Sequence, residues 1–215
     1  MKLFAWLLAL WLPISAVAGS YEDLEEAMIS GDTPWAIRLI ESGLGINAVD
    51  AQGNTLLMQA VQRDNASLFD YLLKKRARLN TRNRNGETAL SLAAYRGKLD
   101  FAQRLVEAGA DVNLYGWPPL IYAAFNGHAP VVDYLLTRGA EVNATTANGS
   151  TALLFAARFG HLEVVKILLQ HQADPNLANE RGATAIDWAL KTDNTDIADL
   201  LRRAGGRSGN PAAVR

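Results

Sequence analysis

Five glycines divide the middle of the chain at a nearly constant interval. They are Gly53, Gly86, Gly116, Gly149 and Gly182, and the spacings between them are 33, 30, 33 and 33 residues. A period of this length is too long for one helix or hairpin and is typical of a supersecondary unit that buries its apolar face only by stacking on its neighbours. The chain is therefore expected to fold as a repeat array, whose function lies along a surface and not in a pocket.

Composition limits the domain count and the kind of partner. The chain has 215 residues, of which 49% are hydrophobic, and this is enough for one well-buried, elongated domain. Its net charge of -1 gives no general attraction to nucleic acid, so we expect a specific protein partner. We also expect a monomer. The absence of cysteine excludes a disulfide framework, thiol chemistry and a lipoprotein anchor.

The first eighteen residues differ from the rest of the chain. Lys2 precedes an apolar run from Leu3 to Leu12, and Ala16-Val17-Ala18 is a small-x-small cleavage site. This pattern predicts a signal peptide at residues 1–18 and a mature chain that is periplasmic or secreted. About ten apolar residues are far fewer than the roughly 20 that span a bilayer, so an uncleaved anchor is the weaker alternative. We expect no stable membrane insertion after cleavage.

The segments that begin at the five glycines are near-copies of one another. They run GNTLLMQAVQRDN, GETALSLAAYRGK, GWPPLIYAAFNGH, GSTALLFAARFGH and GATAIDWALKTDN. The second half of the unit also repeats, as LVEAGADVN, LLTRGAEVN and LLQHQADPN. In both halves the sequence resembles the ankyrin-repeat family, over about residues 21–205. The resemblance implies an all-α solenoid of about six helix-turn-helix units with short β-hairpin fingers.

The repeat register gives the expected domain organisation. A repeat domain covers residues 19–205, and residues 206–215 have the composition of a flexible tail, which follows a last unit without an exit turn. The units lie near residues 21–52, 53–85, 86–115, 116–148, 149–181 and 182–205. Thr88 and Thr151 stand where a hydroxyl can cap a helix, and aliphatic residues such as Leu135 recur three and four apart, as on a core-facing helix.

Some positions depart from the family pattern. Arg76 and Gln172 replace the glycine that usually ends the second helix in a left-handed turn. The finger between Asn113 and Trp117 is three residues short. The family's usual histidine in the tetrapeptide that opens the first helix is absent, with Met58, Ser91, Ile121, Leu154 and Asp187 in its place. Stability is therefore expected to depend more on packing than on that histidine's hydrogen bond.

Titratable residues form no catalytic pattern. His128 and His161 occupy the Gly-His step between the two helices of a unit and are expected to be structural, and His171 is isolated. The chain has no nucleophile elbow, phosphate-binding glycine loop or metal-ligand spacing. We therefore expect no enzyme, no catalytic residue, no metal and no cofactor.

Aromatic residues gather on the face that the resemblance assigns to partner binding. The two positions after each alanine pair usually face solvent in ankyrin stacks, and in three units one of them is aromatic. Trp117 extends this face from the shortened finger. Tyr122, Phe155 and Trp188 precede the alanines, where packing between inner helices is the preferred alternative. The expected partner-binding residues are Tyr95, Arg96, Trp117, Tyr122, Phe125, Phe155, Arg158, Phe159 and Trp188.

These observations predict an exported protein that binds another protein through its concave face and fingers and performs no chemistry. A basic stretch that includes Arg82 and Arg84 is a second candidate surface for an acidic partner, or else a solvated face. Small exported bacterial ankyrin proteins of similar appearance include immunity proteins against secreted toxins and accessory factors for periplasmic stress-defence enzymes such as catalase. A hydrolase is the alternative from another class.

Overall fold

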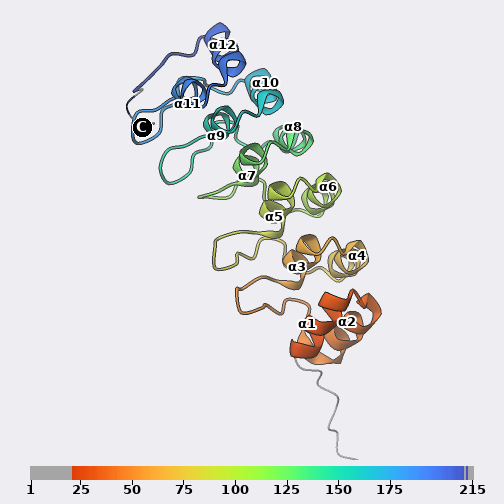
Figure 1. Cartoon of the computed structure of the whole chain (residues 1–215). Coiled ribbons are helices and arrows are strands. Elements are labelled where there is room, and N and C mark those ends of the chain that lie inside the picture. The colour runs from red at the N-terminus through yellow and green to blue at the C-terminus, as the bar shows by residue number, and fades with distance from the viewer. Residues whose placement is uncertain (1–20, 211, 213–215) are drawn as a thin grey trace, which may run out of the picture.

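The chain forms one curved stack of helix pairs (Figure 1). The computed structural model describes residues 21–210 and 212, so the predicted signal peptide at 1–18 lies outside the described residues. The helices are α1 (Tyr21–Ser30) and α2 (Thr33–Leu39), which continues into a π-helical turn η1 (Ile40–Leu44), then α3 (Leu56–Gln62), α4 (Ala66–Lys74), α5 (Ala89–Tyr95), α6 (Leu99–Glu107), α7 (Pro119–Phe125), α8 (Ala129–Thr137), α9 (Ala152–Arg158), α10 (Leu162–Gln170), α11 (Ala185–Lys191) and α12 (Thr195–Arg203).

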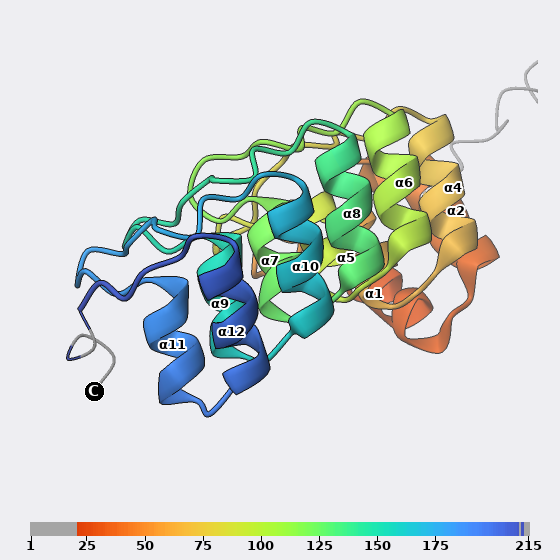
Figure 2. The same cartoon turned by 90° about the horizontal axis from the view of Figure 1, so that it is seen from above.

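The helices form two layers. Odd-numbered inner helices line the side from which the loops project, and even-numbered outer helices cover the opposite side (Figure 1). Outer helices α6, α8 and α10 lie side by side when the stack is seen from above (Figure 2). The predicted helical repeat solenoid is confirmed.

Threonine hydroxyls cap the inner helices, as the sequence indicates. Oγ1 of Thr55, Thr88 and Thr151 accepts a hydrogen bond from the backbone N–H three residues later, each at 3.2 Å. Each bond satisfies a donor that the helix itself leaves unpaired. In the unit with the short finger, Pro118 takes the cap position and Pro119 begins α7, so that helix has no side-chain cap.

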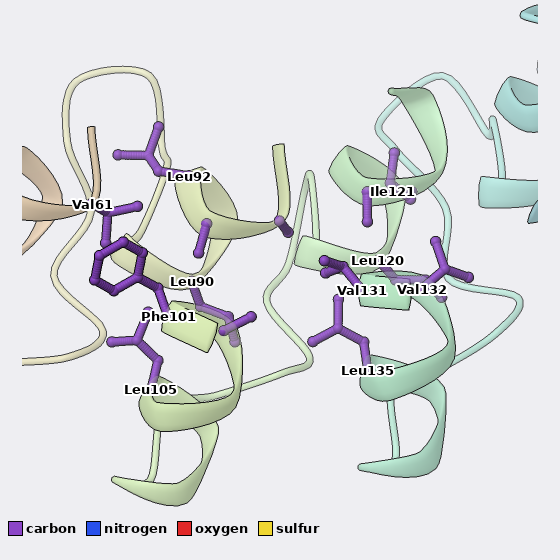
Figure 3. Close-up of a cluster of buried hydrophobic side chains, with 14 of the residues drawn as sticks. Val61, Leu90, Leu92, Phe101, Leu105, Leu120, Ile121, Val131, Val132 and Leu135 are labelled. Atoms are coloured by element: carbon purple, nitrogen blue, oxygen red, sulfur yellow. The ribbon is translucent and has the colours of Figure 1, made fainter. Parts of the chain in front are cut away.

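The core lies between the inner and outer helix of each unit and continues into the next unit. Figure 3 shows Leu90 and Phe101 of one unit, and Leu120 and Leu135 of the next, turned into this layer. The alanine pairs of the inner helices, such as Ala123-Ala124, are fully buried. Because alanine is small, the inner helices approach closely, and packing of this kind supplies the stability of the stack.

An asparagine at the end of each unit's outer half binds the backbone of the next unit. Its Oδ1 accepts from a backbone N–H about 30 residues later in the chain. The pairs are Asn47 with Arg78, Asn80 with Asp111, Asn113 with Glu141, Asn143 with Asp174 and Asn176 with Arg207, at 2.8, 3.0, 2.9, 2.9 and 2.9 Å. Since Arg207 occupies the same place as the other four donors, the last unit does have an exit turn, contrary to our expectation.

Residues 206–210 pack against the last unit, where the sequence indicates a flexible tail. The backbone N–H of Asn210 donates to the carbonyl of Gly182 at 2.9 Å, as Glu180 of the last finger does to Asn148 at 3.0 Å. Gly209 lies so close to the Gly182 carbonyl that an added Cβ would stand 2.3 Å from its oxygen. The segment therefore takes the place that the finger of a further unit would occupy.

Asp187 holds this segment. Its carboxylate accepts hydrogen bonds from the Ser208 hydroxyl, from the Gly209 N–H at 3.0 Å, and from the N–H and hydroxyl of Thr184 at 2.9 and 3.1 Å. Burial raises the pKa of the Asp187 carboxyl, but the hydrogen bonds from Ser208, Thr184 and Gly209 outweigh it and hold the pKa below its ordinary value of 3.8. The residue that replaces the family's histidine in the last unit thus fixes Ser208 and Gly209.

Asp187→Asn is expected to lower the free energy of unfolding by about 1–3 kcal/mol at pH 7, because the amide nitrogen cannot accept these hydrogen bonds. The folded-state pKa is depressed, so the carboxylate's contribution is present above pH 3.8 and is lost as the pH falls through the lower folded-state value. In urea titrations the gap between variant and wild type should therefore narrow from pH 7 to pH 2.5. Asp199→Asn is the control, because Asp199 lies in an exposed ion pair with Arg202 and its replacement should change stability little. If Asp187→Asn lowered stability by the same amount at pH 7 and at pH 2.5, this account would be contradicted.

The fingers are loops and not hairpin ladders within the described residues, so the expected short β-hairpins are reduced to two isolated bridges, Val49 with Thr55 and Thr145 with Thr151. Four fingers are closed by one short backbone hydrogen bond each, such as that from the Asp50 N–H to the Asn54 carbonyl at 3.0 Å, and no longer ladder develops from it within the described residues. Neighbouring fingers are joined by single backbone bonds, such as that from Arg84 to Gln52 at 3.1 Å.

Candidate functional site

Six aromatic side chains form a continuous row across the inner layer of three units. We call this row the aromatic ridge, and it consists of Tyr95, Trp117, Tyr122, Phe125, Phe155 and Phe159. The distances between ring centroids are 6.0 Å for Tyr95–Tyr122, 5.3 Å for Tyr122–Trp117, 5.1 Å for Trp117–Phe155, 5.6 Å for Phe155–Phe125 and 4.6 Å for Phe125–Phe159. These tilted and edge-to-face pairs stabilise one another beyond the area that they bury.

The repeat places the ridge at the ends of inner helices. Tyr95 and Phe125 are the last residues of α5 and α7, and Phe159 directly follows α9. Imidazole Nε2 of His128 lies 2.9 Å from the Tyr95 carbonyl, and that of His161 lies 3.0 Å from the Phe125 carbonyl. The backbone under the ridge is therefore fixed from the next unit, which agrees with the structural role expected for both histidines.

Glycine is required for this arrangement after α5 and α7, whereas Asp64 and Asp193 take the left-handed turn at the equivalent position of two other units, with φ of +58° and +56°. Gly97 and Gly127 have φ of +67° and +76°, in the left-handed region. A Cβ at Gly97 would stand 2.5 Å from Nδ1 of His128, and one at Gly127 would stand 2.6 Å from Nδ1 of His161. The Gly-His step thus combines a turn that glycine favours with a close approach that only glycine permits.

Exposure divides the ridge into a surface part and a supporting part. Tyr95, Phe159 and Trp117 are 45%, 42% and 37% exposed, whereas Phe125 is half-buried and Phe155 is 6% exposed. The positions after the alanine pairs are expected to face solvent, but the Phe125 ring packs against three other rings. For Phe155 the structure agrees with the packing alternative.

The shortened finger accounts for the position of Trp117. With fewer residues between Asn113 and α7, the chain turns back early, and the Trp117 ring lies on Tyr122, Phe125 and Phe155. Tyr115, at the tip of this finger, is 90% exposed. Two aromatic side chains are thereby added to the inner surface at the middle of the stack.

Tyr122 supports the ridge with its ring. Burial, and to a smaller extent the nearby charge of Glu87 and the Tyr95 side chain, raise the pKa of Tyr122 to about 12. Its hydroxyl is therefore neutral at physiological pH. It contributes an apolar ring that contacts Tyr95 on one side and Trp117 on the other.

A cleft adjoins the ridge at the last two units. It has a volume of about 320 Å³ and is lined by Asn148, Ser150, Leu154, Phe155, Arg158, Asn179, Glu180, Arg181 and Trp188. The guanidinium of Arg158 lies 4.2 Å from the centre of the Trp188 ring and 5.2 Å from that of Phe159. Of these lining residues, sequence reasoning found Phe155, Arg158 and Trp188.

Arg181 was missed, although the sequence carries a signal for it. The residue before each finger glycine is Gln52, Asn85, Tyr115, Asn148 or Arg181, so one unit alone has a charge at that position. Comparison of equivalent finger positions would have identified it.

Charge is arranged differently on the two faces. In the part of the chain that the structure describes, all ion pairs but Lys98–Asp64 lie on outer helices or their ends. None of the five arginines Arg82, Arg84, Arg96, Arg158 and Arg181, on the fingers and inner helices, has a carboxylate within 4.0 Å among those residues. These arginines of the concave face thus form no ion pair with the described residues.

Within residues 21–210 and 212, no group of three or more histidine, cysteine or acidic side chains is placed to hold a metal ion. No helix among these residues is both long enough and apolar enough to cross a bilayer.

Comparison with known proteins supports the repeat assignment. The family model described as ankyrin repeats (3 copies) matches residues 57–146 and 120–210. Human ankyrin repeat domain-containing protein 63 is 36% identical over 142 residues, which are 60% of this chain and 37% of that protein. Mouse B-cell lymphoma 3 protein homolog is 34% identical over 123 residues, which are 54% of this chain and 28% of that protein. Human ankyrin repeat and KH domain-containing protein 1 is 51% identical over 67 residues, which are 31% of this chain and 3% of that protein.

The chain therefore spans well under half the length of these curated relatives. They are animal proteins, and they do not support the expected resemblance to small exported bacterial proteins. Ankyrin repeats are typically protein-binding modules without catalytic activity. From the family model, which extends over most of the chain, and from its stacked helix pairs, this protein belongs to the ankyrin-repeat family.

Proposed function

We propose that this protein binds a protein partner through the aromatic ridge and the fingers beside it, without catalysing a reaction. The observation that carries the proposal is the exposure of Tyr95, Trp117 and Phe159 in one continuous row. Gathered apolar surface of this kind marks interaction sites, and aromatic residues with arginine supply most binding hot spots.

Preorganisation supports the same proposal. The rings hold one another, and His128 and His161 fix the backbone beneath them. A partner that docks on the ridge therefore orders few side chains, and the entropy cost of association is small. Arg96 and Arg158 stand at the same helix ends and add long-range attraction for an acidic partner.

We further propose that the protein acts outside the cytoplasm as a monomer, after cleavage behind Ala18. The support is the sequence pattern of residues 1–18. Mass spectrometry of the purified mature protein should give a chain that begins at Gly19. A chain that begins at Met1 and stays in the cytoplasm would refute export. Toxin neutralisation and assistance to a stress-defence enzyme are the two roles that identification of the partner would separate.

Site-specific cross-linking tests the binding face. A photoreactive phenylalanine analogue at position 159 should capture a partner in cells of the source organism, because Phe159 lies on the exposed ridge. The matched control places the same analogue at Lys166, an exposed position on outer helix α10. Capture from position 159 and not from position 166 supports the proposal. Equal capture from both positions, or capture from position 166 alone, would place the interface elsewhere.

A further inference from the structure

We propose that the cleft between α9, α11 and the last finger is a subsite for a carboxylate side chain on the partner's docking segment. This inference rests on the proposed function and specifies the chemistry of the segment that binds beside the ridge. The cleft shares Phe155 with the ridge, and its lining residue Arg158 lies against Phe159 of the ridge, so a segment that covers Phe159 extends directly to the cleft.

Charge in the cleft favours an anion. Arg158 at the end of α9 and Arg181 on the last finger both line it, and Glu180 is its one acidic lining residue. Neither arginine has a carboxylate within 4.0 Å among the residues that the structure describes. The two guanidinium groups therefore have hydrogen-bond donors free for the planar, two-oxygen geometry of a carboxylate.

Arg158 is held in place by aromatic rings. Its guanidinium lies 4.2 Å from the Trp188 ring centre and 5.2 Å from that of Phe159. Stacking of this kind restricts a long side chain and leaves the edge donors of the guanidinium unused, because the attraction acts through its flat face. A carboxylate that binds this arginine therefore meets a group that is already oriented.

The indole of Trp188 provides another unsatisfied donor. Its Nε1 is buried and has no hydrogen-bond partner within the described residues. An indole N–H can only donate, and a buried donor without an acceptor is unfavourable. A carboxylate oxygen that enters the cleft beside this ring supplies such an acceptor. Leu154 and Phe155 complete the cleft with apolar surface.

The size and openness of the site favour a side chain of a docked segment. A volume of about 320 Å³ is at the lower limit for small-molecule pockets, and one wall is a finger loop. One glutamate or aspartate side chain fits there while the rest of the segment lies on the ridge.

A displayed-peptide library provides the test. Random twelve-residue peptides, joined to the phage coat protein through their C-termini so that side chains are the only free carboxylates, are selected on the mature wild-type protein. Selected peptides are expected to share an acidic residue next to an apolar or aromatic one. Replacing that residue by its amide, as Glu→Gln or Asp→Asn in the peptide, should weaken binding at least tenfold.

Protein variants separate the cleft from the ridge. Arg158→Gln should weaken the selected peptides at least tenfold, and Trp188→Phe, which keeps a ring under the guanidinium, should weaken them severalfold. Arg138→Gln is the matched control, because Arg138 stacks on Tyr134 at 5.2 Å on an outer helix, and it should have no effect. Circular dichroism melting curves verify that each variant is folded.

The possible failures are distinct. Peptides that lose binding when Tyr95, Phe125 and Phe159 are replaced by alanine, but not with Arg158→Gln, would overturn the carboxylate subsite and leave the proposed function intact. Peptides that respond to neither change, or a library that yields no peptide sensitive to either, would count against both. Selection of peptides without acidic residues would overturn the subsite alone, provided that their binding depends on the ridge.

Discussion

Leu135→Ala in α8 is expected to lower the free energy of unfolding by about 2–5 kcal/mol, the usual cost of a cavity in a packed core. Leu135 is fully buried in the layer between inner and outer helices (Figure 3). In a repeat array each unit is stabilised by its neighbours, so the loss should also weaken the units that contain α6 and α10. Urea titration followed by circular dichroism measures the cost, and hydrogen exchange measures its spread.

Leu190→Ala is the matched control for this experiment. Leu190→Ala removes the same side-chain volume from inner helix α11. Because Leu190 is 44% exposed, its replacement should change stability by less than about 0.5–1 kcal/mol. Equal stability of the Leu135→Ala and Leu190→Ala variants would show that Leu135 does not stabilise the core of its unit. A loss of protection confined to α8 would instead mean that neighbouring units are not coupled.

Replacement of Tyr95, Phe125 and Phe159 together by alanine is expected to weaken partner binding by several kcal/mol, which is more than a hundredfold in Kd. Hot-spot aromatic residues contribute about 2 kcal/mol or more each, and these three lie in one row. The partner identified by cross-linking is purified, and calorimetric titration with the wild-type and the variant protein measures the change in Kd. A matched outer-face variant, Tyr71→Ala with Tyr134→Ala, should bind normally.

The ridge variant should also lose some stability. The sequence alone suggests that outward-pointing aromatics contribute nothing to the fold, but the rings contact one another, and each such pair stabilises by about 0.5–1.5 kcal/mol. A modest drop in melting temperature with the helical signal intact is therefore expected. Complete unfolding would assign the rings to the core. Normal binding by a folded variant would move the interface, and the basic stretch from Lys74 to Arg84 is then the next candidate.

Periodicity made the fold predictable. Most units repeat a threonine at the helix start, small residues on the inner helix and an aliphatic stripe on the outer helix, so several weak local signals combine into a strong one. The structure agrees even where the pattern is broken, because Arg76 and Gln172 keep the left-handed turn of the missing glycine, with φ of +59° and +64°. A non-glycine residue in that turn costs about 1 kcal/mol, which a well-packed unit tolerates.

The conformation of residues 206–210 and the arrangement of the ridge could not be predicted from the sequence. Gly205 to Asn210 has a loop-like composition, and its fixed conformation depends on Asp187, about twenty residues earlier. Likewise, the repeat register places Trp117 on the correct face, but only the geometry of the short finger lays its ring on Phe155. Contacts that single residues make far along the chain do not repeat from unit to unit, so the repeat pattern does not predict them.

The packing of residues 206–210 on the last unit affects how readily these molecules associate with one another at high concentration. Units that stack face to tail can in principle continue from one molecule to the next, and a contact of that kind, once made, repeats into an open filament. Here the Asn176 Oδ1 and the Gly182 carbonyl, which a following unit would engage, are already taken by Arg207 and Asn210 of the same chain. Arg207 and Asn210 thus occupy two acceptors through which a unit of another molecule would otherwise extend the stack.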